Sequence, residues 1–347
     1  MACPGLSGRR IEYFLRVNTG TRVKLVTRGG IALTGAFVML AAAGCGGSSP
    51  AATSTLGAGS SLAAAAAQAA THAAQPSPTP DAKPRPCTAP YVRGFSCAMR
   101  ERIAQVEKYL AGAPGEIGVV LRDRKTGAVW RAGHAYSQFP AASTMKLAVA
   151  TDLLLRQQEG QIHFSGYDWS LMYNMLHESD DNAANALWAK YESSSFRYRI
   201  RHFGMTGASF SGEINWGFMY CTPADLGNLI DYVLTRLPAR LRTYLVTELQ
   251  HVAPIQRWGV WGAGAANHPG NKDGWEDDEN QTLWITNTVG FSGAGQRYTL
   301  AIMYDLEGYG AAGTSQGFDY GSNRLTQVAS LLFQGRYTSH PTAVATP

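Results

Sequence analysis

Apolar residues in the middle of the chain recur at spacings that predict a helix followed by two strands. Residues 97–112 carry apolar side chains at helical spacing and end in a glycine stop signal, which predicts a helix. The apolar runs 116–123 and 127–133 are typical of strands. Turn-forming residues lie between the two runs, so we expect them to form a hairpin.

The later part of the chain predicts a helical region, two more strands and a last helix. An apolar helix is expected over 143–158, and a mostly helical region continues to Leu237. Strands are expected near 282–291 and 297–305, and a helix over 323–334. Because strands and helices are grouped rather than alternating, the pattern indicates the α+β class. We expect an antiparallel sheet flanked by N- and C-terminal helices that pack together, with a helical insertion between the strands.

The first 45 residues indicate export. The apolar run 31–43 follows basic residues and is too short to cross a bilayer, which is typical of a secretory signal. The segment ends in Ala-Ala-Gly-Cys, which resembles a bacterial lipobox, in which Cys45 would be lipidated. An ordinary signal peptide cut nearby is the alternative. We therefore expect an extracytoplasmic protein, either anchored to the bacterial membrane as a lipoprotein or secreted.

Two segments lack the apolar residues that a folded core requires. Residues 46–86 consist mainly of Ala, Gly, Ser, Thr and Pro and predict a disordered tether. Residues 339–347 are expected to be a disordered tail. The segment 87–338 between them has the length of one domain or of two closely joined lobes, and we expect it to be monomeric.

Charge and cysteine content exclude some classes of function. Residues 1–45 hold six Arg/Lys and one Glu, so the rest of the chain has 24 basic and 24 acidic residues and no basic domain for nucleic acid. Of five cysteines, Cys87 and Cys97 are close enough in sequence to be a disulfide candidate in an exported protein, and Cys221 would be a free, buried thiol. No cluster has zinc-ligand spacing. No motif requires a metal or an organic cofactor.

A candidate nucleophile opens the predicted helix over 143–158. Ser143 and Lys146 form the single S-x-x-K of the chain, and a spacing of three places both side chains on one helix face. A serine hydroxyl is a weak nucleophile until a base takes its proton, and a buried lysine with a lowered pKa can be that base. Alone, the pattern is more typical of a capped buried helix than of a catalytic site.

A second motif supports a catalytic role for Ser143 and Lys146. The stretch LHESDDNAANALW begins 33 residues after Ser143, and together with FPAASTMK it resembles the serine β-lactamase and D,D-peptidase superfamily, particularly class A β-lactamases. The resemblance implies that Ser179 matches the serine of the family's S-D-N motif. Asp181 stands where that motif has Asn.

The third family motif, K-T-G, has two candidates in this chain. The literal K-T-G begins at Lys125, but it precedes the nucleophile and lies in a predicted turn, which favours a solvated loop lysine. Lys272-Asp273-Gly274 comes in the right order. The resemblance implies that Lys272 supplies positive potential, that Gly274 lets substrate backbone approach, and that the oxyanion hole is formed by the backbone N–H groups of Ser143 and Trp275.

Departures from the family pattern bear on the substrate. Asp181 and Asp273 replace groups that bind the substrate amide and carboxylate, and a carboxylate can neither donate a hydrogen bond nor attract another carboxylate. Glu213 and Asn215 do not have the E-x-x-x-N spacing of the deacylating glutamate in class A enzymes. Five tryptophans also lie in this part of the chain, where core packing is favoured over ligand stacking: Trp216, Trp258, Trp261, Trp275 and Trp284.

These observations predict an exported, membrane-anchored serine hydrolase that forms an acyl-enzyme on amide or ester substrates. A small molecule or a peptide would be the substrate, with a role at the cell wall and without efficient β-lactamase activity. Peptidoglycan and β-lactams are the ligand classes that the resemblance suggests. One alternative is a class A-type β-lactamase with an atypical deacylation route. Another is a non-catalytic binding or scaffold lipoprotein of the same fold.

Overall fold

The computed structural model describes residues 86–277, 284–306 and 316–335. The chain divides into two units, residues 1–77 and 78–347, and every described residue lies in the second. The predicted signal segment, the Cys45 lipidation site, nearly all of the tether and the C-terminal tail therefore lie outside the described residues.

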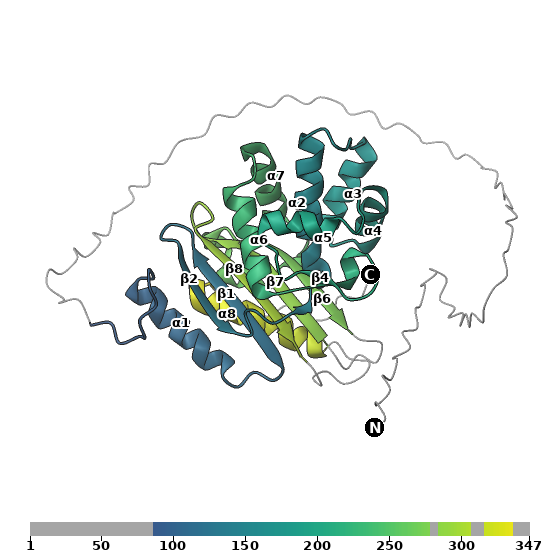
Figure 1. The fold of residues 1–347 in the computed structure, drawn as a ribbon. Coiled ribbons are helices and arrows are strands. Elements are labelled where there is room, and N and C mark those ends of the chain that lie inside the picture. Colours follow the sequence, from purple (N-terminus) through teal and green to yellow (C-terminus); the bar gives the residue numbers. More distant parts are fainter. Residues whose placement is uncertain (1–85, 278–283, 307–315, 336–347) are drawn as a thin grey trace, which may run out of the picture. The chain divides into compact units, whose positions relative to one another are not determined.

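A five-stranded antiparallel sheet forms the centre of the described body (Figure 1). Its strand order is β2-β1-β8-β7-β6. The strands are β1 (Glu116–Asp123), β2 (Ala128–Gly133), β6 (Gly270–Asp277), β7 (Trp284–Ser292) and β8 (Tyr298–Asp305). The sequence predicted four of them. The fifth, β6, is an edge strand and carries the Lys-Asp-Gly triplet, with Lys272 opposite Val289 of β7.

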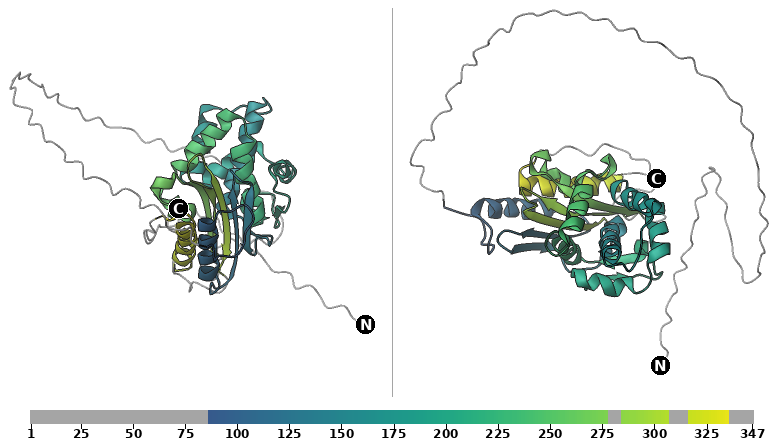
Figure 2. Two further views of the ribbon diagram at one scale, coloured as in Figure 1. Left: turned by 90° about the vertical axis from the view of Figure 1, so that its left-hand side faces the viewer. Right: turned by 90° about the horizontal axis from the view of Figure 1, so that it is seen from above.

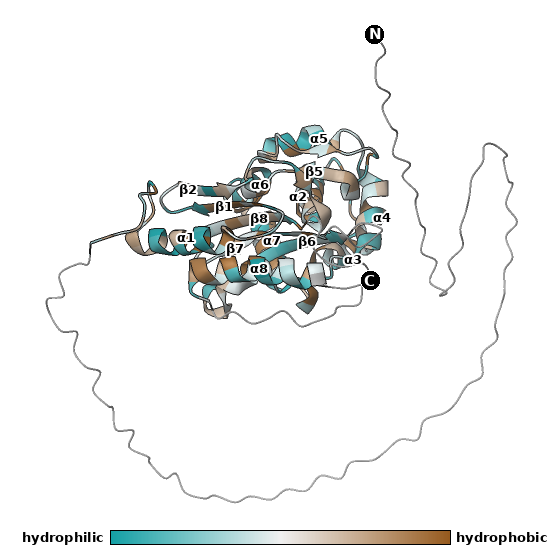
Figure 3. Ribbon diagram, turned by 90° about the horizontal axis from the view of Figure 1, so that it is seen from below, coloured by the Kyte–Doolittle hydropathy of each residue, from teal (hydrophilic) through white to brown (hydrophobic). Residues whose placement is uncertain are grey.

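The two faces of the sheet contribute to two separate hydrophobic cores, because side chains alternate along each strand. In β8, Leu300, Ile302 and Tyr304 pack into the core that includes α1 (Cys97–Leu110) and α8 (Gln316–Phe333). Ala301 and Met303 face the other core. Figures 1 and 2 show α1 and α8 side by side on one face of the sheet, which confirms that prediction. Both helices combine hydrophilic and hydrophobic segments, as expected for helices with one buried side (Figure 3).

The other core is covered by the helical insertion. Its α-helices are α2 (Met145–Gln158), α3 (Gly166–His177), α4 (Asp181–Tyr191), α5 (Phe196–Arg199), α6 (Pro223–Thr235) and α7 (Ala239–Gln250). Its short 3₁₀ helices are η1 (Ala142–Thr144), η2 (Ile200–Phe203), η3 (Trp216–Phe218) and η4 (Pro254–Gln256). Two more follow, η5 (Gly259–Ala263) and η6 (Ala265–Asn267), and η5 packs against α8 in the first core. A second, small sheet has the order β3-β5-β4, formed by β3 (Phe139–Pro140), β4 (Ser209–Phe210) and β5 (Met219–Cys221). This insertion positions the candidate site against β6.

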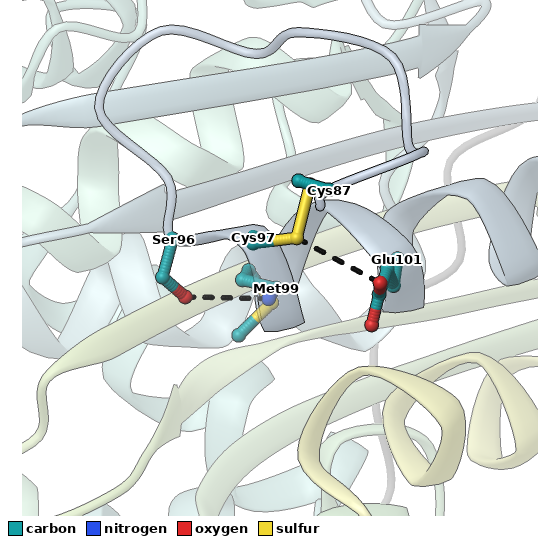
Figure 4. Close-up of a disulfide and its surroundings, with 5 residues drawn as sticks. All are labelled: Cys87, Ser96, Cys97, Met99 and Glu101. Carbon is teal, nitrogen blue, oxygen red and sulfur yellow. Dashed lines mark hydrogen bonds between the residues drawn. A yellow bond between two sulfur atoms is a disulfide. The ribbon is translucent and has the colours of Figure 1, made fainter. Parts of the chain in front are cut away.

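A disulfide fixes the N-terminal edge of this body. It joins Cys87 to Cys97 at the first residue of α1, beside the Ser96 hydroxyl, which accepts a hydrogen bond from Met99 N at 3.3 Å (Figure 4). Among described residues, the one group with metal-ligand proximity is this cysteine pair with Glu101, and its sulfurs are already bonded to each other. Cys221 is free and buried, as the sequence predicted. No helix within the described ranges has both the length and the apolarity to cross a membrane.

Candidate active site

Ser143 lies in the short helix η1, immediately before α2. The segment leading into it is fixed from two sides. Ala141 N donates to Met219 O of β5 at 2.8 Å, and the Asn287 side chain of β7 donates to Pro140 O at 2.9 Å. Ala142 has a φ of +46°, a region that L-residues rarely adopt and that clusters at functional sites. Sequence reasoning missed Asn287, although a polar residue in a buried strand is a signal that could have identified it.

Lys146 is completely buried one turn further along, and its three donors are all engaged. Its Nζ lies 2.5 Å from Ser179 O, 3.3 Å from Ser179 Oγ and 2.5 Å from Asp181 Oδ1. The Trp216 ring covers the same ammonium, with its centroid 4.5 Å away. Burial lowers the pKa of Lys146, and the Asp181 carboxylate opposes part of that effect.

Ser179 connects α3 to α4 in a strained backbone conformation, with a φ of +61°. The following residue, Asp180, caps α4 by accepting from Ala183 N at 3.0 Å. The capped helix start holds the Ser179 carbonyl and hydroxyl toward the lysines. Two of the five described non-glycine residues with positive φ, Ala142 and Ser179, therefore belong to the two motifs of this site.

Lys272 reaches the same serine hydroxyl from β6. Its Nζ lies 2.8 Å from Ser179 Oγ and 2.9 Å from Asp273 O, and it also contacts Gln256 Oε1. Gln256 is itself fully buried and donates to the carbonyls of Leu176 and His177, so it joins Lys272 to the end of α3. No sequence signal distinguished Gln256.

Three oxygen atoms surround the Lys272 ammonium group. Its Nζ donates to Ser179 Oγ, Gln256 Oε1 and Asp273 O. Burial, first, and the nearby charge of Lys146 hold the pKa of Lys272 well below its ordinary value. Lys146 differs because it forms a salt bridge with Asp181, which opposes part of the effect of burial.

Asp273 lies in a different environment from the one that the sequence predicted. It is fully buried, on the face of β6 opposite Lys272. Burial raises the pKa of Asp273 well above its ordinary value, an effect that hydrogen bonds from Thr288 and Asn271 offset only in part. The sequence predicted that Asp273 would repel substrate carboxylates, but the structure places this carboxyl in the interior, where burial disfavours its charged form.

Gly274 was expected to let substrate backbone approach, but in the structure it lies against the backbone of the nucleophile segment. A Cβ on Gly274 would lie 2.7 Å from Thr144 N and 2.9 Å from Ser143 N. This contact places β6 directly against the nucleophile segment. Trp275, whose backbone N–H was predicted to complete an oxyanion hole, is the next residue of the same strand. Ser143 itself is half-buried, and no described residue forms a hydrogen bond with its hydroxyl.

Other candidates lie apart from this group. The literal K-T-G forms the β1–β2 turn, where Lys125 is exposed and its N–H donates to Asp123 Oδ1 at 2.9 Å, as predicted for a loop lysine. Glu213 is exposed and pairs with no described residue. Three of the five tryptophans pack around Phe318 on the far side of the sheet: Trp258, Trp275 and Trp284. Core packing is therefore confirmed for most of them, and Trp216 is the one that contacts a site lysine.

Fold and site layout together define a serine β-lactamase-like protein. Residues 99–165 match the Beta-lactamase2 model, described as "Beta-lactamase enzyme family". The chain is 26% identical over 227 residues to LppW of Mycobacterium tuberculosis, a protein provisionally named a lipoprotein, and the match covers 62% of this chain and 71% of that one.

Solved structures show the same fold. A β-lactamase from Chitinophaga pinensis superposes with a TM-score of 0.56 at 14% identity, covering 67% of this chain and 98% of that one. A β-lactamase from Xanthomonas campestris gives 0.54 at 19% identity, covering 68% and 98%. The resemblance and the α+β fold inferred from the sequence are confirmed.

Proposed function

We propose that this protein is an exported serine hydrolase that forms an acyl-enzyme on amide or ester substrates, with Ser143 as nucleophile. The observation that carries the proposal is the convergence of two buried lysines, Lys146 and Lys272, on the hydroxyl of Ser179. Burying two amines is costly unless they are paired, and a chain that needed only a packed core would fill these positions with apolar residues.

The acylation step follows from the hydrogen bonds around Ser179. Lys146, in its amine form, takes the proton of Ser143 as Oγ attacks the acyl carbon. The bond to the leaving group breaks, and Ser179 gives its hydroxyl proton to the leaving nitrogen or oxygen. Lys146 then restores the Ser179 proton across their 3.3 Å contact. Because Lys146 must be uncharged at the moment of attack, acylation rises with pH, and burial shifts that rise below the ordinary lysine range.

The surroundings of the site favour substrates other than penicillins. The Asp181 side chain is 62% exposed and presents a carboxylate, which repels a substrate carboxylate. Asp273 is buried and offers no hydroxyl to bind one. An amide or ester in cell-wall peptide, without a free carboxylate near the scissile bond, fits this environment better.

A membrane anchor at Cys45 completes the proposal. Its support is the Ala-Ala-Gly-Cys ending of the first segment and the provisional lipoprotein name of LppW. Metabolic labelling with an alkyne fatty acid should mark the wild-type protein and not Cys45→Ser. Labelling of the variant would contradict an anchor at this residue.

Intact-protein mass spectrometry tests the nucleophile. After incubation with a serine-directed fluorophosphonate, the wild-type protein should gain one adduct, and Ser143→Ala should gain none while keeping its melting temperature. Incubation with benzylpenicillin separates the enzyme types. A lasting adduct indicates a penicillin-binding peptidase, and rapid hydrolysis indicates a β-lactamase.

One observation favours a second candidate, a non-catalytic binding module. All three Lys146 donors are directed to Ser179 and Asp181, and none reaches Ser143. Absence of any phosphonate adduct on the folded wild-type protein would support this candidate over the hydrolase.

A further inference from the structure

Hydrolysis of an acyl-enzyme needs a base for the attacking water, because the ester between Ser143 and the acyl group persists until water is deprotonated as it attacks. Neither lysine is exposed to that water, since Lys146 and Lys272 are both fully buried and both contact the Ser179 hydroxyl. The carboxylates near Lys146 are therefore the candidates for this base.

The acidic residues that could act as this base differ in their contacts and exposure. Asp180 is committed to the cap of α4 through Ala183 N. Asp273 is buried on the other face of β6. Glu213 is exposed and has no described partner. From the same part of the chain, it is the Trp216 ring that contacts the Lys146 ammonium. Asp181 alone combines contact with Lys146 and exposure to water.

The two oxygens of Asp181 differ in their surroundings. Oδ1 lies 2.5 Å from Lys146 Nζ, whose side chain has 0% exposure, whereas the Asp181 side chain is 62% exposed. No described residue donates a hydrogen bond to Oδ2. One oxygen thus faces the buried lysine while the other can hold a water molecule on the solvent side.

We propose that Asp181 is the general base of deacylation, a role that rests on the proposed hydrolase function. Acylation leaves Lys146 as an amine, which takes up a proton from solvent and again pairs with Asp181. Asp181 then takes a proton from water as the water oxygen bonds to the acyl carbon of the Ser143 ester. The bond from that carbon to Oγ breaks, Oγ takes a proton from the Lys146 ammonium, and the carboxylic acid leaves. Asp181 passes its proton to the Lys146 amine across their direct contact, which restores the resting ion pair.

Pre-steady-state kinetics with p-nitrophenyl acetate test this role. Wild-type protein should release a burst of about one p-nitrophenolate per molecule and then turn over steadily. Asp181→Asn should keep the burst, lose about 10²-fold or more of the steady rate, and accumulate acetylated Ser143 by mass. Glu178→Gln is the matched control, because this exposed neighbour pairs with His177 and not with Lys146, and it should behave as the wild type.

Several outcomes would overturn the proposal, and they are distinguishable. Steady turnover of Asp181→Asn at the wild-type rate excludes Asp181 as the base while leaving the hydrolase intact. Loss of the burst in a folded Asp181→Asn assigns Asp181 to acylation instead. If wild-type protein releases no p-nitrophenolate that depends on Ser143, the hydrolase itself fails, and this role of Asp181 fails with it.

Discussion

At the scale of single residues, the site is governed by which of its buried groups carry charge. The site contains four ionisable side chains: Lys146, Asp181, Lys272 and Asp273. Of these, Lys146 and Asp181 form a salt bridge. Lys272 and Asp273 are both fully buried, and burial shifts their pKa values toward the neutral forms. The fold thus disfavours the charged forms of two of these four side chains.

The raised pKa of Asp273 makes stability depend on pH. Because its pKa is raised in the folded state, the unfolded chain loses this proton at lower pH, so stability falls as pH rises above about 4. Asp273→Asn cannot ionise and should melt several degrees higher at pH 7, since about 1 kcal/mol corresponds to about 2–4 °C in a domain of this size. Near pH 4 the two melting temperatures should converge. Exposed Glu213→Gln is the control, and an equal gain for Asp273→Asn at both pH values would contradict an ionisation effect.

The lowered pKa of Lys272 predicts that arginine cannot replace it. A lysine in this environment can give up its proton and then accept the Ser179 hydroxyl hydrogen, whereas guanidinium keeps its proton and has no lone pair. Lys272→Arg should therefore lower the fluorophosphonate labelling rate about 10²-fold although its side chain is positively charged. Lys125→Arg, at the exposed literal K-T-G, should label at the wild-type rate. If Lys272→Arg also labels normally, positive potential alone suffices at this position.

At the scale of elements, the contact between β6 and the nucleophile segment decides the geometry of the site. Gly274→Ala would bring a methyl group to within 2.7 Å of Thr144 N, and backbone cannot yield as a flexible side chain does. We expect a loss of roughly 1–3 kcal/mol in urea unfolding together with slower labelling of Ser143. Gly112→Ala is the control, because no atom lies within 4 Å of its added methyl group. An unchanged labelling rate in Gly274→Ala would show that this contact does not position Ser143.

Sequence patterns predicted the elements with regularly spaced apolar residues. They missed elements and residues that are buried by contacts with parts of the chain distant in sequence. The first hairpin and the first helix were predicted almost residue for residue, since their apolar residues alternate or recur regularly. Strand β6 was not predicted, because its letters GNKDGWED are mostly polar and its burial comes from neighbouring elements. For the same reason Gln256 was missed, since its importance lies in carbonyl and lysine partners distant in sequence.

The site motifs were likewise predictable where order along the chain decides, and unpredictable where the register of the sheet decides. The order of three motifs predicted that Lys146, Ser179 and Lys272 belong together, and the structure places them within hydrogen-bonding distance. It could not predict that Asp273 would face away from them, because a strand alternates its side chains and the register depends on the whole sheet. Nor could spacing reveal that Asp181 would reach Lys146 rather than a substrate.

At the scale of the whole molecule, the described body draws its stability from residues beyond position 86. Both hydrophobic cores and the Cys87–Cys97 disulfide are built from this part of the chain. The sheet lies between the two cores, and the described members of both cores lie between Phe95 and Phe333. Stability and site geometry should therefore be separable from export and anchoring.

A chain of residues 86–347, produced in an oxidising compartment, tests that separation. We expect its melting temperature to agree within about 2 °C with that of the chain from residue 46, and its Ser143 labelling rate to be unchanged, because the shorter chain keeps every described core residue. Removing the disulfide from the shorter chain by Cys87→Ser and Cys97→Ser should lower its stability by about 2–3 kcal/mol, the loop-closure entropy of a segment this short. A large loss of stability on removing residues 46–85 alone would mean that the tether contributes to the folded body, and the domain boundary would have to move toward the N-terminus.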